Sequence, residues 1–195
     1  NVADGTFDTG AHGGAVAITG GTATIEHADF VGNRLTYTNM GLNFGGAVAG
    51  YQATMSLNGC VFADNECEGG AAGGALAIYE GQGAATSCTF VHNGASSWGY
   101  PQHGGTVYVR EGALSLTACI ITGAWGRDWE GDPPLPANAA ASSLGTITAT
   151  DCDVWGNGEN WTGPLAGQVG HDGNFSVAPC FCDATVGDFH LCADS

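Results

Sequence analysis

The segment Gly13-Gly14-Ala15-Val16-Ala17-Ile18 decides the fold, because variants of it recur along the chain. Three later segments begin in the same way: 45–49 (GGAVA), 73–78 (GGALAI) and 104–109 (GGTVYV). Their first glycines are Gly13, Gly45, Gly73 and Gly104, which are almost evenly spaced. Self-similarity at a period of about 30 residues indicates a solenoid, in which each repeat buries its apolar side against the next.

A second motif follows each of these four starts. Its copies are 28–33 (ADFVGN), 60–65 (CVFADN), 88–93 (CTFVHN) and 119–121 (CII), and a fifth copy at 152–157 (CDVWGN) lacks the Gly-Gly start. The separation between the first glycine and this motif is identical in all four repeats, whereas the separation between the motif and the next Gly-Gly varies. A constant part followed by a part of variable length predicts strands joined by loops of different lengths.

The constant part has the alternation of β-strands. Val16 and Ile18, and then Ala23 and Ile25, alternate with their neighbours, and equivalent pairs recur in later repeats. No stretch shows a sustained helical period, so we expect an all-β chain with almost no helix. Strands stacked about 4.8 Å apart place equivalent residues above one another. The expected columns are Phe30, Phe62 and Phe90; Asn33, Asn65, Asn93 and Asn157; and Cys60, Cys88, Cys119 and Cys152.

The Gly-Gly-Ala-Val/Leu and Cys-x-Phe-x-x-Asn motifs resemble the repeats of secreted and surface right-handed parallel β-helix proteins, including polymorphic outer-membrane proteins and autotransporter-like passengers. The ending Cys180-Phe181-Cys182-Asp183, with Gly187 to Leu191, resembles the closing segment of bacterial β-helix domains. This resemblance implies a single right-handed parallel β-helix of about five to six coils. It says little about activity, because this scaffold carries lyases, hydrolases, adhesins and structural fibres.

Length and charge limit the organisation and the partners. The 195 residues carry a net charge of −16 and include no lysine. We expect one domain over 1–195, with a lead-in at 1–12, repeated coils at 13–157 and a degenerate terminal coil with its closing segment at 158–195. The negative field would repel nucleic acid and anionic lipid. No apolar run reaches the roughly 20 residues that cross a bilayer, so membrane insertion is not expected.

The eight cysteines fall into two groups. Cys60, Cys88, Cys119 and Cys152 are expected as buried thiols, since side chains in register one strand apart suit disulfide torsion poorly. Cys67, Cys180, Cys182 and Cys192 are placed in loops or in the terminal segment. Cys180 or Cys182 can pair with Cys192 in a disulfide that closes the end of the solenoid. Such a bond would imply export, and we expect an extracellular or cell-surface location.

Catalytic and metal sites have weak support. Asp151 and Asp153 form the best carboxylate pair for glycoside hydrolysis, and His171 and Asp172 could join them. We prefer to interpret them as solvent-facing aspartates, and we expect no enzyme, no catalytic residue, no cofactor and no metal site. Weak calcium binding by loop carboxylates stays open, although no known calcium spacing occurs among them. These carboxylates are Asp8, Asp64, Glu66, Glu68, Asp128, Glu130 and Asp132.

Aromatic residues gather in two loops that follow successive copies of the second motif. Trp98 and Tyr100 follow the third copy, and Trp125 and Trp129 follow the fourth. These rings either pack on the wall of the solenoid or meet a partner, which would be a sugar or another subunit. An adhesive, carbohydrate-binding module is therefore one alternative function, and a polysaccharide lyase or glycoside hydrolase is a second. Asn160 and Asn174 lie in glycosylation tripeptides, which often occur by chance.

The leading hypothesis concerns the ends of the stack. The opening end shows no capping helix in the sequence, and uncovered coil ends are templates for strand addition. We therefore expect a non-catalytic, extracellular structural module that binds copies of itself through its coil ends and forms a fibre or surface layer. Ice binding would need a flat and regular threonine array. The sequence does not favour it, because Thr22, Thr24 and Thr54 align with Ala, Gly or Leu in other coils.

Overall fold

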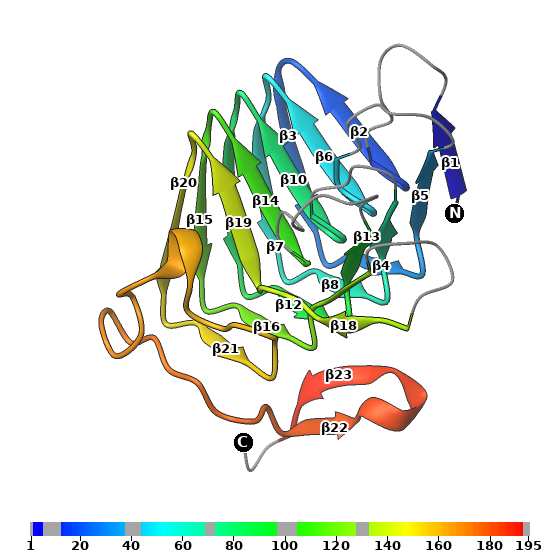
Figure 1. Ribbon diagram of the computed structural model, residues 1–195. Helices are drawn as coiled ribbons and strands as arrows, with labels where there is room; N and C mark the ends of the chain where they lie inside the picture. The colour runs from blue at the N-terminus through cyan, green and yellow to red at the C-terminus, as the bar shows by residue number, and fades with distance from the viewer. Residues whose placement is uncertain are drawn as a thin grey trace.

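The computed structural model describes residues 2–5, 13–37, 44–68, 73–96, 105–127 and 133–192. In these ranges the chain winds into a solenoid whose coils are stacked from β2 to β20 (Figure 1). Helical structure is limited there to two single 3-10 turns, η1 (Gly163–Leu165) and η2 (Ala184–Val186). The predicted all-β, parallel solenoid is confirmed. No helix in the described ranges is long and apolar enough to span a bilayer.

Four sheets form the walls, and each is named by one of its strands. The β2 sheet contains β2 (Val16–Thr19), β6 (Val48–Tyr51), β10 (Leu76–Tyr79), β14 (Val107–Arg110) and β19 (Ala140–Ser143). The β3 sheet contains β3 (Thr22–Glu26), β7 (Thr54–Asn58), β11 (Gln82–Thr86), β15 (Ala113–Thr117) and β20 (Thr146–Thr150). The β4 sheet contains β4 (Asp29–Val31), β8 (Val61–Ala63), β12 (Thr89–Val91), β16 (Ile120–Thr122) and β21 (Asp153–Trp155). The β5 sheet contains β1 (Val2–Gly5), β5 (Arg34–Tyr37), β9 (Glu66–Cys67), β13 (Gly94–Ser96), β17 (Trp125–Arg127) and β18 (Leu135–Pro136).

The coil count is lower than expected. Five strands in each of the β2, β3 and β4 sheets span about four complete turns of the chain, not the five to six coils predicted. The difference arises after Trp155, where the chain adds no further strand to these sheets and instead covers the last coil. Phe175 makes only an isolated bridge to Asp153 there.

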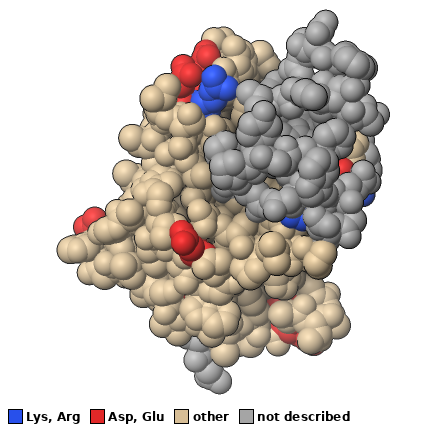
Figure 2. Space-filling view, in the orientation of Figure 1, with Lys and Arg blue, Asp and Glu red and all other residues tan. Residues whose placement is uncertain are grey.

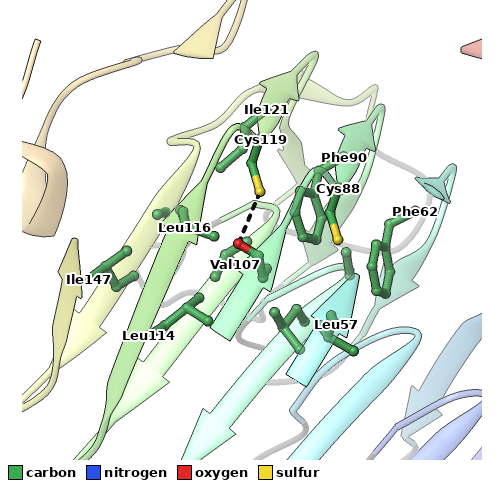
Figure 3. Close-up of a cluster of buried hydrophobic side chains, with 14 of the residues drawn as sticks. Leu57, Phe62, Cys88, Phe90, Val107, Leu114, Leu116, Cys119, Ile121 and Ile147 are labelled. Carbon is green, nitrogen blue, oxygen red and sulfur yellow. Dashed lines mark hydrogen bonds between the residues drawn. The ribbon is translucent and has the colours of Figure 1, made fainter. Parts of the chain in front are cut away.

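The phenylalanine and cysteine columns lie inside the stack, as Figure 3 shows for Phe62, Phe90, Cys88 and Cys119. The ring centroids of Phe30 and Phe62 are 4.8 Å apart, and those of Phe62 and Phe90 are 4.7 Å apart. Both pairs are stacked, with interplanar angles of 14° and 11°. These distances equal the spacing of paired strands, so each ring lies directly over the next.

An asparagine ladder satisfies the buried polar groups of one corner. The Asn33 side chain donates from Nδ2 to Asn65 Oδ1 (2.9 Å), and Asn65 Nδ2 donates to Asn93 Oδ1 (2.9 Å). Ala124 holds the equivalent position in the next coil, so the amide chain stops at Asn93. One coil later, Asn157 Oδ1 accepts from the Ala124 backbone N–H (2.8 Å). Asn157 therefore shares the column but has no amide contact with Asn93.

The Gly-Gly pairs make the corner that begins each coil. The two positions of the pair require glycine for different physical reasons. Gly13, Gly45 and Gly73 have φ angles of 64°, 70° and 72°, which L side chains rarely adopt. Gly46 and Gly74 face the neighbouring backbone instead. A Cβ at Gly46 would clash with the carbonyl oxygen of Gly74 in the next coil. Each repeat thus needs two glycines. The first allows the positive φ angle at the corner, and the second allows close contact between the backbones of neighbouring coils.

A terminal hairpin lies against the outside of the β4 sheet. Its strands β22 (Phe181–Asp183) and β23 (Asp188–Leu191) pair antiparallel, and Figure 1 shows them below the stacked coils. Phe189 packs on Ala63 and Val91, which are buried in consequence. The hairpin therefore covers the middle of this outer face.

Candidate functional site

The N-terminal end of the solenoid presents strand edges. In the described residues, β2, β3 and β4 each have a neighbouring strand on only one side, because they are the last strands of their sheets. The β5 sheet differs, since β1 pairs in parallel with β5 and covers it. The first coil therefore has edge groups that can bond to a further strand.

Apolar side chains of the first coil are also incompletely covered. Val16, Ile18 and Ile25 point into the interior and pack against the core, yet all three are only half-buried. The counterparts of Val16 and Ile25 one coil further on, Val48 and Leu57, are 0% and 2% exposed. The N-terminal coil end is defined by β2, β3 and β4, and it exposes part of the hydrophobic core at the edge of the stack.

The C-terminal end has the opposite character, because residues 158–177 cover the last coil. Gln168 acts as a substitute strand: its Oε1 accepts from the Ala149 N–H (2.7 Å), and its Nε2 donates to the Ile147 carbonyl (2.9 Å). Leu165, in η1, is 0% exposed and fills the interior. Figure 1 shows this segment in orange beside β19 and β20. Two backbone groups of β20, the Ala149 N–H and the Ile147 carbonyl, thus find partners in this segment.

Asn174 completes this cover. Its Oδ1 accepts from the Cys152 N–H (3.0 Å), and its Nδ2 donates to the Ala149 carbonyl (2.8 Å). The residue is 3% exposed, so the nitrogen that a glycan would need is buried and bonded. Asn160 lies in the other tripeptide, and its Oδ1 accepts from Asn157 Nδ2 (3.0 Å), where a further ladder residue would stand. Both asparagines act in the closure of the stack.

Of the predicted aromatic loop residues, only Trp125 is described, and its expected loop position is wrong, because it begins strand β17. Trp98, Tyr100 and Trp129 lie outside the described residues, as do Asp8, Asp128, Glu130 and Asp132. Trp125 Nε1 donates to the His92 carbonyl (2.8 Å), and the Arg127 guanidinium lies 4.7 Å from the ring centroid. Its ring also lies over Gly94, where a Cβ would collide with it. Trp125 therefore has structural partners, and its surroundings give no particular support to sugar stacking.

Two arginines and two glutamates form a charged cluster on the outer face of the β5 sheet. Glu66 lies in β9, and Glu68 follows it directly, so the sequence expectation that placed both in a loop is wrong for Glu66. Arg34 pairs with Glu68 and approaches Glu66 (3.5 Å), and Arg127 pairs with Glu66 (3.2 Å). Burial, and next the Glu68 charge, raise the pKa of Glu66. The charges of the four groups balance, which fits a structural ion network between coils.

The Asp151 and Asp153 pair is not arranged for shared chemistry. Asp153 is 5% exposed and its Oδ1 accepts from the Val177 N–H (3.0 Å), so it fixes the closing segment. Burial raises the pKa of Asp153. Asp151 is exposed at a corner with φ of 53°, and its N–H donates to the Asp172 carbonyl (2.8 Å). The expectation that both aspartates face solvent is thus wrong for Asp153, because residues 175–177 fold over it.

The cysteine column and the terminal cysteines differ in accessibility. Column thiols donate to backbone carbonyls, as Cys119 does to Ala85 (3.4 Å, the dashed line in Figure 3). Burial raises the pKa of Cys60, which disfavours its thiolate. Cys67 is also buried, in β9, so its expected loop position is wrong. Column members are Cys60, Cys88, Cys119 and Cys152, each no more than 1% exposed.

The terminal cysteines meet in the hairpin. Cys182 Sγ lies 2.6 Å from Cys192 Sγ, and the Cys192 N–H donates to the Cys180 carbonyl (3.0 Å). The sulfur contact therefore involves Cys182 in preference to Cys180. A disulfide between Cys182 and Cys192 stays a prediction.

No family model matches the chain, and neither a curated protein nor a solved structure does. The resemblance to surface β-helix repeats therefore rests on the motifs and on the parallel solenoid that they form. Within the described residues, no three His, Cys, Asp or Glu side chains converge as a metal site would require.

Proposed function

We propose that this protein is a non-catalytic, extracellular structural module that associates with a second copy of itself through its N-terminal coil end. The observation that carries this proposal is the contrast between the two ends. Gln168 and Asn174 bond to the last coil. By contrast, Val16, Ile18 and Ile25 of the first coil are half-buried, and in the described part of the chain β2, β3 and β4 each pair with a strand on one side. Acidic composition and the Cys182–Cys192 contact support an extracellular setting.

Because the C-terminal end is covered, it limits which kinds of assembly the protein can form. A head-to-tail fibre needs two complementary open ends, and in this chain one of them is occupied by residues 158–177. Two N-terminal ends can instead meet about a two-fold axis. Their edge strands then run antiparallel, which is a standard pairing. The proposal therefore favours a closed pair over the open fibre expected from the sequence.

Charge works against this contact and makes it dependent on salt. Each copy carries −16, and the exposed carboxylates of Glu26 and Asp29 lie in the first coil. On the face that Figure 2 shows, the described residues include acidic side chains in separate groups among residues that are mostly neither acidic nor basic. Salt screens such repulsion over a Debye length of about 10 Å at 0.1 M. We therefore expect the fraction of dimer to rise with ionic strength.

Sedimentation velocity over a range of protein and salt concentrations tests the proposal. The wild type is expected to form a dimer that strengthens with salt, and Ile18→Glu combined with Ile25→Glu is expected to stay monomeric. Leu144→Glu is the matched control, because Leu144 is 88% exposed at a distant corner, and this variant should dimerise normally. Circular dichroism checks that all variants retain β-structure.

Three results would overturn the proposal. The first is a wild type that stays monomeric at millimolar concentration in high salt. The second is a dimer unaffected by the Ile18 and Ile25 substitutions, which would place the contact elsewhere. The third is long fibres in electron micrographs, since these require a second open end.

A further inference from the structure

The outer face of the β3 sheet is a regular array of small side chains with hydroxyl groups. Residues alternate along each strand, so that in β20 Thr146, Thr148 and Thr150 are exposed while Ile147 is buried. Pairing in register makes three columns of outward residues. The columns are Thr22, Thr54, Gln82, Ala113 and Thr146; Thr24, Ser56, Ala84, Ser115 and Thr148; and Glu26, Asn58, Thr86, Thr117 and Thr150. This set, the hydroxyl face, carries Thr or Ser at ten of its fifteen positions.

The register corrects the alignment that argued against such an array. The glycine and leucine that interrupt that alignment, Gly83 and Leu114, belong to the column of Met55 on the interior side. The residues that flank Thr24 across the sheet are Ser56 and, further on, Ala84. The real interruptions are the small Ala84 and Ala113, together with Gln82, Glu26 and Asn58. A shift of one residue exchanges the two sides of a strand, which is the source of the error.

The spacing of the hydroxyl face is nearly constant in both directions. Neighbouring coils are 4.7 to 4.8 Å apart, as the phenylalanine centroids show. Outward residues along one strand repeat at about 6.7 Å, which is twice the rise per residue. The five strands pair residue for residue with no bulge. Both repeat distances are close to those between water molecules on faces of hexagonal ice.

The face is also nearly uncharged on a strongly acidic protein. Glu26 is its only ionisable residue, although the chain carries 19 acidic residues. It has no aromatic ring for a sugar and no basic group for an anion. In the described part of the chain, no hydrogen bond ties the hydroxyls of Thr24, Thr146 or Thr148 to another side chain. These hydroxyls are therefore available to solvent in a fixed pattern.

We propose that the hydroxyl face binds the surface of an ice crystal. Threonine offers a methyl group that orders the adjacent water and a hydroxyl that bonds to it. Water held on a regular grid matches a crystal lattice, and each ordered water can bridge the protein and the solid. A rigid, stacked sheet loses little entropy when it binds, because its side chains are already in place. This activity is independent of the N-terminal contact proposed above.

Partition into slowly grown polycrystalline ice tests the proposal directly. The wild type, labelled with a fluorescent dye, is expected to enter the ice well above the level of the dye alone. Ser115→Tyr places a large ring in the middle column of the face, on β15, and should abolish this enrichment. Thr19→Tyr is the matched control, since Thr19 is exposed at the end of β2 on a different sheet, and it should partition like the wild type.

A variant that binds ice more strongly than the wild type shows that the face itself is responsible, because misfolding could only weaken binding. Ala84→Thr combined with Ala113→Thr fills both alanine gaps, and this variant should partition more strongly than the wild type and slow the coarsening of ice grains at lower concentration. Exclusion of the wild type from ice to the level of the dye would overturn the proposal. So would a Ser115→Tyr variant that enters the ice as well as the wild type does.

Discussion

Replacement of Asn65 by Asp is expected to lower the free energy of unfolding by at least about 3 kcal/mol at pH 7. Asn65 is 0% exposed and its Nδ2 donates to the Phe30 carbonyl (2.8 Å) and to Asn93 Oδ1 (2.9 Å). A carboxylate has no proton to donate, so it would face two acceptors inside the stack. The Asn33 N–H (2.9 Å) would still have an acceptor, which limits but does not cancel the loss.

The pH dependence of this variant has a definite sign. Burial among acceptors raises the folded-state pKa of the introduced carboxyl above its unfolded value of about 3.9. The folded state then binds more protons, so the variant loses stability as the pH rises from about 4 through the folded pKa. Urea unfolding at pH 4 and pH 7 measures this effect, and the deficit relative to the wild type should be smaller at pH 4.

A matched substitution distinguishes two causes of lost stability: the broken asparagine ladder and the added negative charge. Asn58→Asp makes the same chemical change on the outward side of β7, where no ladder passes. It lies opposite Glu26, so repulsion in solvent is included, and it should cost no more than about 1 kcal/mol. Equal losses for the Asn65 and Asn58 variants would show that the ladder contributes nothing specific. The comparison would then favour overall charge as the cause.

The repeat allowed much of the fold to be predicted from the sequence. The Gly-Gly pairs indicate where each coil turns a corner, and the Phe-x-x-Asn spacing indicates which residues stack in columns. Both recur because each coil must satisfy the same steric limits as its neighbour. Other corners are occupied by residues other than glycine, and the sequence gives no recurring motif that marks them. His27, Ser87, Ala118 and Asp151 all have φ between 51° and 53°, yet they have no residue type in common. Position in the coil, and not side-chain chemistry, sets that conformation.

The sites were harder to predict than the fold. Asn174 looks like a glycosylation acceptor because its tripeptide is local, whereas its bonds to Cys152 and Ala149 join parts of the chain that are distant in the sequence. Gln168 lies outside every repeat, so no column could indicate its role. The hydroxyl face escaped sequence reasoning for a different reason. An error of one residue in a period of two exchanges inside for outside, and only the pairing register removes that error.

Truncation of Phe62 to Ala is expected to lower the free energy of unfolding by about 3–5 kcal/mol. Phe62 is 0% exposed and lies between two rings, at 4.8 Å from Phe30 and 4.7 Å from Phe90. Its removal leaves a cavity that the rigid coils above and below cannot close. Val31→Ala, on the outer face where Val31 is 58% exposed, should change stability by about 0.5 kcal/mol or less.

The same truncation at Phe30 connects stability with assembly. Among the described residues a ring stacks on one side of Phe30, that of Phe62, so Phe30→Ala should cost less than Phe62→Ala in a dilute monomer. If two N-terminal coil ends meet, the neighbouring copy covers the other side, and the cost at Phe30 should grow with protein concentration. Urea unfolding at low and high concentration measures both variants. A cost at Phe30 that equals that at Phe62 at every concentration would mean that the first coil is already as well covered as the second, which contradicts an open end.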